Sequence, residues 1–171
     1  MASENIIAVV SDALRGQVQA VLPEGAAAML GVPRQAEAIE GVWLHLFRIA
    51  QPPVMRTTPV IAASGKRLNR ETQLHLDYLV CGQAPDGLQA HALSGMALAA
   101  LVDQPMLGDR ELRPFLSQPQ RHDALLPGSL SVQWKALDLP LLEQAAVWQA
   151  SGTPQQAGVF WRADVIWRSG Q

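Results

Sequence analysis

Alternation of apolar and polar residues predicts four β-strands in this chain. The first two, residues 42–50 and 73–81, are apolar on both faces, which is typical of central strands covered on both sides. The other two, residues 129–135 and 158–168, alternate more regularly, so we expect the last strand to have one buried and one partly exposed face. Residues 35–39 are a further short candidate.

Within the first of these strands, strict alternation predicts which side chains share a face. One face is expected to carry the odd-numbered residues Trp43, His45, Phe47 and Ile49. The opposite face is expected to carry the even-numbered residues Val42, Leu44, Leu46 and Arg48. Phe47 and Arg48 are thus expected to point to opposite sides of the sheet.

Apolar residues at helical spacing predict three helices. The first covers residues 4–22, with Ser3 as its N-cap and an apolar stripe that extends to Val21. The second covers residues 88–103, and its inward stripe is rich in small residues, so this helix can pack close to a sheet. The third opens at Pro140 and runs to residue 149, with an expected buried face of Leu141, Leu142, Ala145 and Trp148.

The order of these elements predicts the fold class. We expect an α/β (α+β) domain over residues 1–171, with a small mixed sheet of about four strands flanked by three helices. Residues 26–34 are expected to connect elements without forming one. Residues 106–128 contain three prolines and are expected to be a loop with room for one short turn.

A long segment between the two central strands is predicted to be a functional loop. Prolines at 52, 53 and 59 exclude a helix or a central strand over residues 51–69. Loops of this length within compact domains are usually functional or disordered. This loop, taken as residues 51–70, contains the candidate partner-contact residues Met55, Arg56, Lys66, Arg67 and Arg70.

The composition favours a protein that assembles over one that catalyses. Hydrophobic residues make up 49% of the 171 residues and charged residues only 16%, so other subunits are expected to cover some apolar surface. A net charge of −2 argues against nonspecific binding of nucleic acid. No apolar run approaches the roughly 20 residues of a membrane helix. The single cysteine and an N-terminus without a basic region predict cytoplasmic synthesis.

Residues with catalytic or metal-binding chemistry form no recognised motif. His45, His75 and Asp77 could share a metal if their strands pair in register, but their spacing matches no known zinc or facial-triad pattern. Ser94 lies in a helical pattern, not in a nucleophile turn. Residues 64–67 lack the glycine and the hydroxyl residue of a phosphate-binding loop. We therefore expect no catalytic residue, no cofactor and no metal.

Cys81 and most of the tryptophans are expected to be buried. No cationic residue adjoins Cys81 in sequence, which favours a small buried side chain over a reactive thiol. Trp43, Trp148 and Trp161 are expected in the core. For Trp167, a core position and an interface anchor both stay open.

Five segments of this chain together resemble a known protein family. They are the strand Trp43–Ile49 with the following Pro52–Arg56, the strand Leu74–Val80, the helix end Leu101–Leu107, the helix Leu137–Trp148 and the final strand Phe160–Trp167. Their order and spacing resemble the tube-terminator, or cap, component of extracellular contractile injection systems of the antifeeding-prophage type, which is similar in fold to phage tail terminators. Thr57 stands where the family often has asparagine, and many members carry a further C-terminal region.

The resemblance implies a tail-terminator-like fold and a structural role. It implies a homohexameric ring that sits on the end of the inner tube and engages the last sheath ring. The partners would be other copies of this chain, the inner tube protein and the sheath protein, in a particle that assembles in the cytoplasm and can be released. Two alternatives stay open: another structural component, such as a baseplate or connector subunit, and a small metal-dependent enzyme that uses His45, His75 and Asp77.

Overall fold

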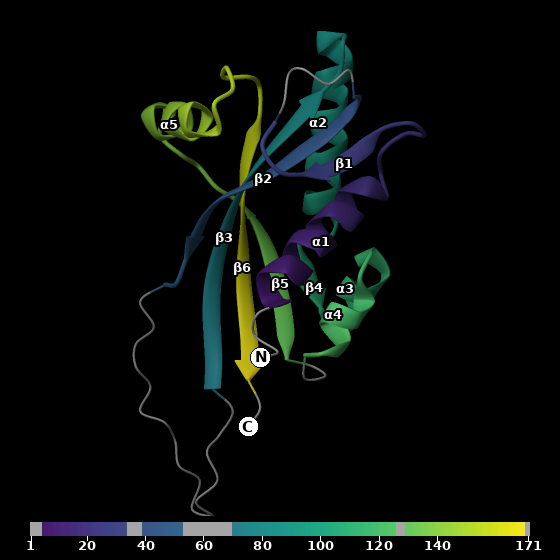
Figure 1. Ribbon diagram of the computed structural model, residues 1–171, viewed down its shortest axis with the longest axis vertical. Coiled ribbons are helices and arrows are strands. Elements are labelled where there is room, and N and C mark those ends of the chain that lie inside the picture. Colours follow the sequence, from purple (N-terminus) through teal and green to yellow (C-terminus); the bar gives the residue numbers. More distant parts are fainter. Residues whose placement is uncertain (1–4, 34–38, 53–69, 126–128, 170–171) are drawn as a thin grey trace, which may run out of the picture.

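One six-stranded sheet organises the part of the chain that the computed structural model describes, residues 5–33, 39–52, 70–125 and 129–169. Its strands are β1 (Ala27–Leu30), β2 (Gly41–Ala50), β3 (Arg70–Gln83), β4 (Met106–Gly108), β5 (Leu130–Ala136) and β6 (Val159–Ser169). Their spatial order is β1-β2-β3-β6-β5-β4, and every pair is antiparallel except β1 with β2. The long strands β3 and β6 form the central ribbon of the sheet (Figure 1).

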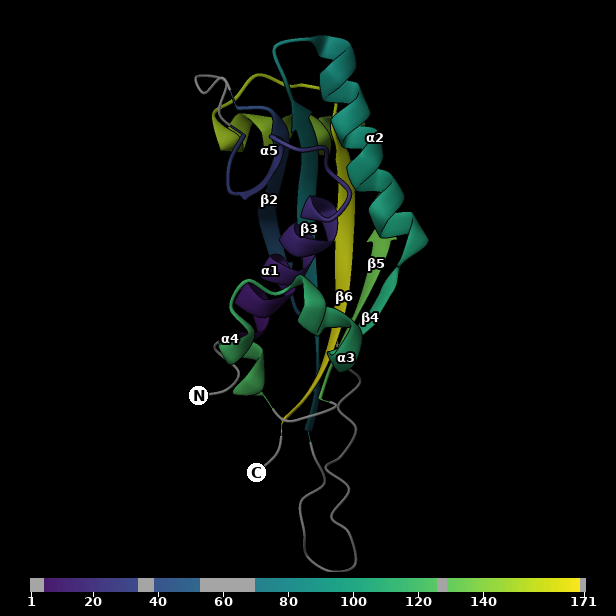
Figure 2. The same cartoon turned by 90° about the vertical axis from the view of Figure 1, so that its right-hand side faces the viewer.

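The helices cover the two faces of the sheet unequally. On one face lie α1 (Ile6–Gln19), α2 (Gly87–Asp103), α3 (Asp109–Leu112), the 3-10 helix η2 (Arg113–Phe115) and α4 (Pro119–Asp123). Of the helices in the described residues, only α5 (Leu141–Ser151) lies on the other face, near one end of the strands (Figures 1 and 2). Among the described residues, no helix combines the length and apolar character needed to cross a bilayer.

The α+β class and the four predicted strands are confirmed, but the sheet is larger than expected. The predicted strands correspond to β2, β3, β5 and β6, while β1 and β4 lie in the segments 26–34 and 106–128 that were expected to connect elements. These two strands are too short to show a periodic pattern and depend on their neighbours in space. The side chain of Gln19 holds the start of β1: its NH2 group donates to Ala26 O, and its carbonyl oxygen accepts from Ala28 N. The candidate strand at 35–39 lies largely outside the described residues.

Helix α1 buries one side of its surface in the main core between the helical layer and the sheet. It begins at Ile6, with Asn5 at the N-cap position, and it ends at Gln19, which leaves Val21 exposed in the following turn. The predicted N-cap Ser3 lies outside the described residues. Buried Gln17 ties three elements together. Its amide donates to Ala100 O and Gln104 O at the end of α2, at 3.0 and 2.9 Å, and its carbonyl oxygen accepts from Trp134 Nε1 of β5 at 2.9 Å.

The predicted close approach of α2 to the sheet is confirmed. A Cβ atom at Gly82 of β3 would lie 2.2 Å from Ala90 O of α2, so only glycine fits at this point. Gly82 N donates instead to Ser94 Oγ at 2.8 Å, and this serine in turn donates to Ala90 O. The hydroxyl of Ser94 therefore bonds to the backbone of both β3 and α2, which agrees with the predicted helical position of this serine.

A separate small apolar cluster anchors α5 on the other face of the sheet. It consists of Leu79, Cys81, Leu139, Trp148 and Phe160. Trp148 is 1% exposed, whereas Leu141 and Leu142 are 72% and 83% exposed, so the prediction that these two leucines are buried was wrong. The helix contacts the sheet through its last turns, and its first turn projects away.

The expected core positions of three tryptophans are confirmed. Trp43, Trp148 and Trp161 are all buried. Trp167, for which two positions stayed open, is partly buried and packs against the main cluster between the sheet and the helical layer.

Candidate partner-binding surface

The partner-contact residues predicted from the sequence cannot be placed on a surface. Met55, Arg56, Lys66 and Arg67 lie outside the described residues. Arg70 is the first residue of β3 and pairs in register with Ser169, but its side chain is also outside the described part. Their assignment as contact residues stays a prediction.

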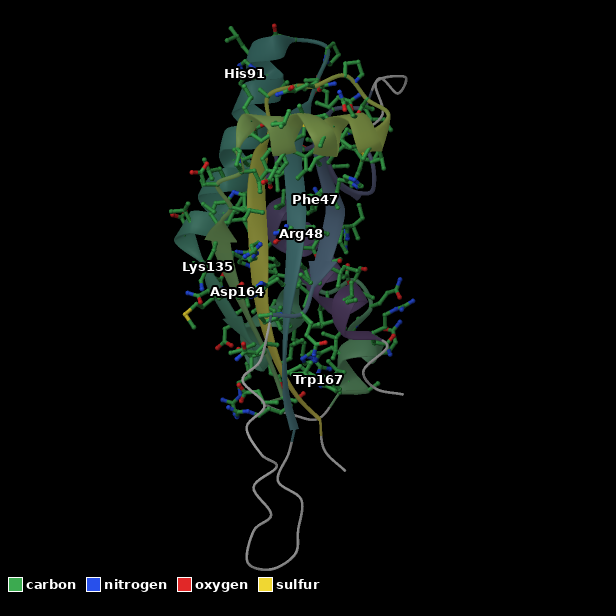
Figure 3. The ribbon with its side chains drawn as sticks, turned by 90° about the vertical axis from the view of Figure 1, so that its left-hand side faces the viewer. Phe47, Arg48, His91, Lys135, Asp164 and Trp167 are labelled. Carbon is green, nitrogen blue, oxygen red and sulfur yellow. The ribbon has the colours of Figure 1, made fainter. Side chains whose placement is uncertain are left out.

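The structure instead reveals a charged surface that the sequence did not predict. Below α5, no described helix lies over this face of β2, β3, β6 and β5 (Figure 3). Charged side chains from these four strands occupy it in rows that run across the sheet. We call this surface the charged face, and it consists of Arg48, Glu71, His75, Asp77, Lys135, Arg162, Asp164 and Arg168.

Asp77 is the buried centre of the charged face. Its carboxylate is completely buried, and two arginines from the neighbouring strands hold it. Arg48 Nε donates to Oδ2 at 2.6 Å, while Arg162 donates from Nε to Oδ1 at 2.7 Å and from Nη2 to Oδ2 at 3.2 Å. Burial acts to raise the pKa of Asp77, but the hydrogen bonds and charges of Arg162 and Arg48 outweigh it and lower the pKa. Asp77 is therefore a structural anion that orients two cations.

A β-bulge brings Arg48 to this position. The register of β2 against β3 shifts between Leu46, which faces Tyr78, and Arg48, which faces Asp77, so Phe47 is the additional residue. Phe47 packs edge-on against Phe160 on the α5 side, with the ring centroids 5.8 Å apart. Phe47 and Arg48 therefore share a face, and the prediction that they lie on opposite faces was wrong.

A second row of charges lies beside the first. Lys135 Nζ donates to Asp164 Oδ2 at 2.6 Å, and His75 Nε2 lies 3.4 Å from Asp164 Oδ1. Figure 3 shows Lys135 and Asp164 towards the β5 side of the face and Arg48 nearer its middle. Farther along the strands, Arg168 Nε lies 3.4 Å from Glu71 Oε2. The charged rows therefore lie on paired strands, and the uncharged residues Gln73, Ile166 and Ser131 separate the Arg168–Glu71 pair from the rest.

The possible metal site at His45, His75 and Asp77 does not form. Both oxygens of Asp77 are bound by arginines, and His75 faces Asp164 instead. His45 is not one of the residues of the charged face, and burial lowers its pKa. No set of three or more histidine, cysteine or acidic side chains in the described residues is arranged to hold a metal ion.

Two other places could carry chemistry: the single cysteine and an open cavity. Cys81 is 1% exposed, and burial raises the pKa of its thiol to about 11, which confirms its expected inert position. An open cavity of about 510 Å³ lies between the end of β3, the start of α2 and residues 156–157. His91 is the one titratable residue among the described residues of its lining, and no cysteine or carboxylate accompanies it there.

Solved structures with a fold similar to that of this chain include two components of injection particles. One is described as the PVC sheath/tube terminator of an extracellular contractile injection system in its extended state, with a TM-score of 0.65, 18% identity, and coverage of 96% of this chain and 57% of that chain. The other is the anti-feeding prophage cap, a tube terminating cap, with a TM-score of 0.65, 17% identity, and coverage of 95% and 55%. This chain thus spans little more than half the length of either protein.

Sequence comparison gives the family. No curated protein matches the sequence. Residues 8–170, almost the whole chain, match the family described as the Pvc16 N-terminal domain. This match and the two structural matches confirm the predicted resemblance to tube terminators of contractile injection systems. The chain belongs to the Pvc16 N-terminal domain family.

Proposed function

We propose that this protein is a structural subunit that caps the inner tube and the last sheath ring of a phage-tail-like contractile injection particle. The observation that carries the proposal is the family match over residues 8–170. The fold shared with a sheath/tube terminator and with a tube terminating cap supports it. The role is one of assembly and not of catalysis, and it agrees with the arginine-bound state of Asp77 and the inert environment of Cys81.

Exposed apolar side chains support assembly into a homohexameric ring. Leu88, Leu98 and Val102 fall on one side of α2 and are 79%, 37% and 58% exposed. Leu141 and Leu142 in the first turn of α5 are also largely exposed, and α5 lies on the opposite face of the sheet (Figure 1). Different apolar patches on different sides of one subunit suit head-to-tail contacts, and such contacts generate rings when the rotation closes.

Particles assembled with and without this protein test the capping role. We expect tubes of defined length that end in a density for this protein, and overlong or unstable tubes when the protein is omitted. Electron microscopy of the two preparations measures both length and end structure. If particles without the protein instead fail to form a baseplate, the chain is a baseplate or connector subunit and the capping proposal is wrong.

The predicted loop contacts can be tested by charge reversal. We expect that replacing Arg56, Lys66, Arg67 and Arg70 together by glutamate will reduce co-sedimentation with tube or sheath polymers at least tenfold, because these cations would pair with acidic groups there. The circular dichroism spectrum and the melting temperature should change little. Unchanged co-sedimentation of the folded variant would remove these residues from the interface.

A further inference from the structure

The charged face carries more positive than negative charge, although the chain as a whole has a net charge of −2. Its cations are Arg48, Lys135, Arg162 and Arg168, and its carboxylates are Glu71, Asp77 and Asp164. His75 adds a further positive charge when it is protonated. The surplus is therefore local and lies on the part of the sheet that no described helix covers (Figure 3).

The surplus arises because two guanidinium groups share one buried carboxylate. Asp77 is fully buried, whereas the side chain of Arg48 is 47% exposed. Arg48 uses only Nε for Asp77, and within the described part of the chain its two terminal nitrogens bond to no other residue. A guanidinium group held in this way presents N–H donors that match the two oxygens of a second carboxylate.

The cations of the charged face are also held in place before any partner binds. Arg48, Arg162 and Lys135 each pair with a carboxylate on an adjacent strand, at 2.6 to 2.7 Å. Side chains that are already ordered lose less conformational entropy on binding, so more of the interaction energy appears as affinity. The bulge at Phe47 that directs Arg48 to this face is typical of positions where a strand re-aims a side chain.

We propose that the charged face is a docking surface for an acidic segment of a protein partner, whose carboxylates bind to Arg48, Arg162 and Lys135. The inference rests on the proposed function only in naming that partner as a structural protein of the particle. A protein segment with a few carboxylates suits this face better than nucleic acid does. The cations alternate with carboxylates that would repel a continuous phosphate backbone, and the small surplus of charge would release few counterions.

Neutralising Arg48 and Lys135, the more exposed two of the three proposed contact residues, tests this inference. The test variant is Arg48→Gln with Lys135→Gln; Arg162 is kept because it holds Asp77 through two hydrogen bonds. The matched control is Arg113→Gln with Arg121→Gln, which removes two exposed cations on the helical side, where Arg113 pairs with Asp123. Inner tube polymer and sheath polymer are used as separate probes in co-sedimentation. We expect the test variant to bind one of them at least tenfold more weakly, and the control to bind like the unmodified protein.

The remaining outcomes of this experiment are decisive as well. Equal binding by test variant and control would overturn the inference, as would a change in self-association alone, which would assign the face to a second copy of the chain. Duplex DNA serves as a third probe. If the test variant lost binding to DNA but kept its binding to both polymers, the inference would be overturned too. Urea unfolding establishes that both variants are folded, and Lys135→Gln alone, away from Asp77, repeats the test should the double variant unfold.

An acidic peptide separates failure of the inference from failure of the proposed function. If the unmodified protein binds neither polymer, the proposed capping role is wrong. Titration with a peptide of alternating glutamate and serine, against a peptide of alternating lysine and serine, then still tests the charged face. Binding of the acidic peptide that Arg48→Gln with Lys135→Gln weakens would support the inference, and absence of such binding would overturn it.

Discussion

Replacing Asp77 with asparagine should lower the free energy of unfolding by about 3 kcal/mol, because it leaves two arginines beside a buried neutral group. The carboxylate is fully buried and accepts hydrogen bonds from both Arg48 and Arg162. The two guanidinium groups are partly exposed and regain some hydration, so we take the lower end of the range for a broken buried ion pair. Urea unfolding with an unchanged m-value measures the loss.

The control for this variant is Asp123→Asn. Asp123 pairs with Arg113 in a bridge whose side chains are 47% and 57% exposed, so the change should be within about 1 kcal/mol. A loss at Asp77 no larger than the loss at Asp123 would contradict the structural role assigned to Asp77.

The pH dependence of the same variant provides a second measurement. The folded-state pKa of Asp77 is lowered from its ordinary value of 3.8, so its contribution to stability is complete above that value and is lost as the pH falls through the folded-state pKa. The difference in stability between the unmodified protein and Asp77→Asn should therefore be constant near neutral pH and shrink below about pH 4. A difference that stays constant into this acid range would contradict the lowered pKa.

Replacing Trp148 with alanine should cost about 3–5 kcal/mol and release α5 from the sheet. Trp148 is the one buried residue of α5, and it packs in the small cluster with Leu79, Cys81 and Phe160. In the unmodified protein, burial shields the thiol of Cys81. Without the Trp148 side chain, water and reagents should reach this thiol. Urea unfolding measures the loss of stability, and the rate at which a thiol reagent labels Cys81 under native conditions measures the release of the helix.

Leu142→Ala is the matched control on the same helix. Leu142 is 83% exposed, so its removal should change the free energy of unfolding by less than about 0.5 kcal/mol and leave the labelling rate of Cys81 unchanged. The assignment of Trp148 as the anchor fails if Trp148→Ala labels Cys81 no faster than Leu142→Ala does.

The strands that the sequence predicted are those with long runs of alternating residues. Such runs carry their own signal, because one buried face requires an apolar residue at every second position. The short strands β1 and β4 carry no such signal, since they form only where β2 and β5 already supply hydrogen-bonding partners. The exposed leucines at the start of α5 were misassigned for a related reason: a short helix that contacts the sheet through one turn needs no continuous apolar stripe.

The charged face was missed because its geometry depends on pairing between strands. Asp77 lies among apolar residues in β3, and a buried carboxylate in such a strand needs a cation from a neighbouring strand. That requirement could have been stated from the sequence, and Arg162 in the last predicted strand was an available partner. Arg48 could not have been assigned, because alternation alone places it on the opposite face from Phe47 and no local signal marks the bulge.

The bulge in β2 makes the register of this strand against β3 decide which charges reach the surface. If β2 lacked this bulge, strict alternation would set Phe47 opposite Asp77 and turn Arg48 towards the helical layer. Asp77 would then keep a single guanidinium partner, and the positive surplus would disappear without any charged residue having been changed. A count of charges along the chain would not detect such a change of register, although it would leave this part of the surface without the net charge that attracts an acidic partner.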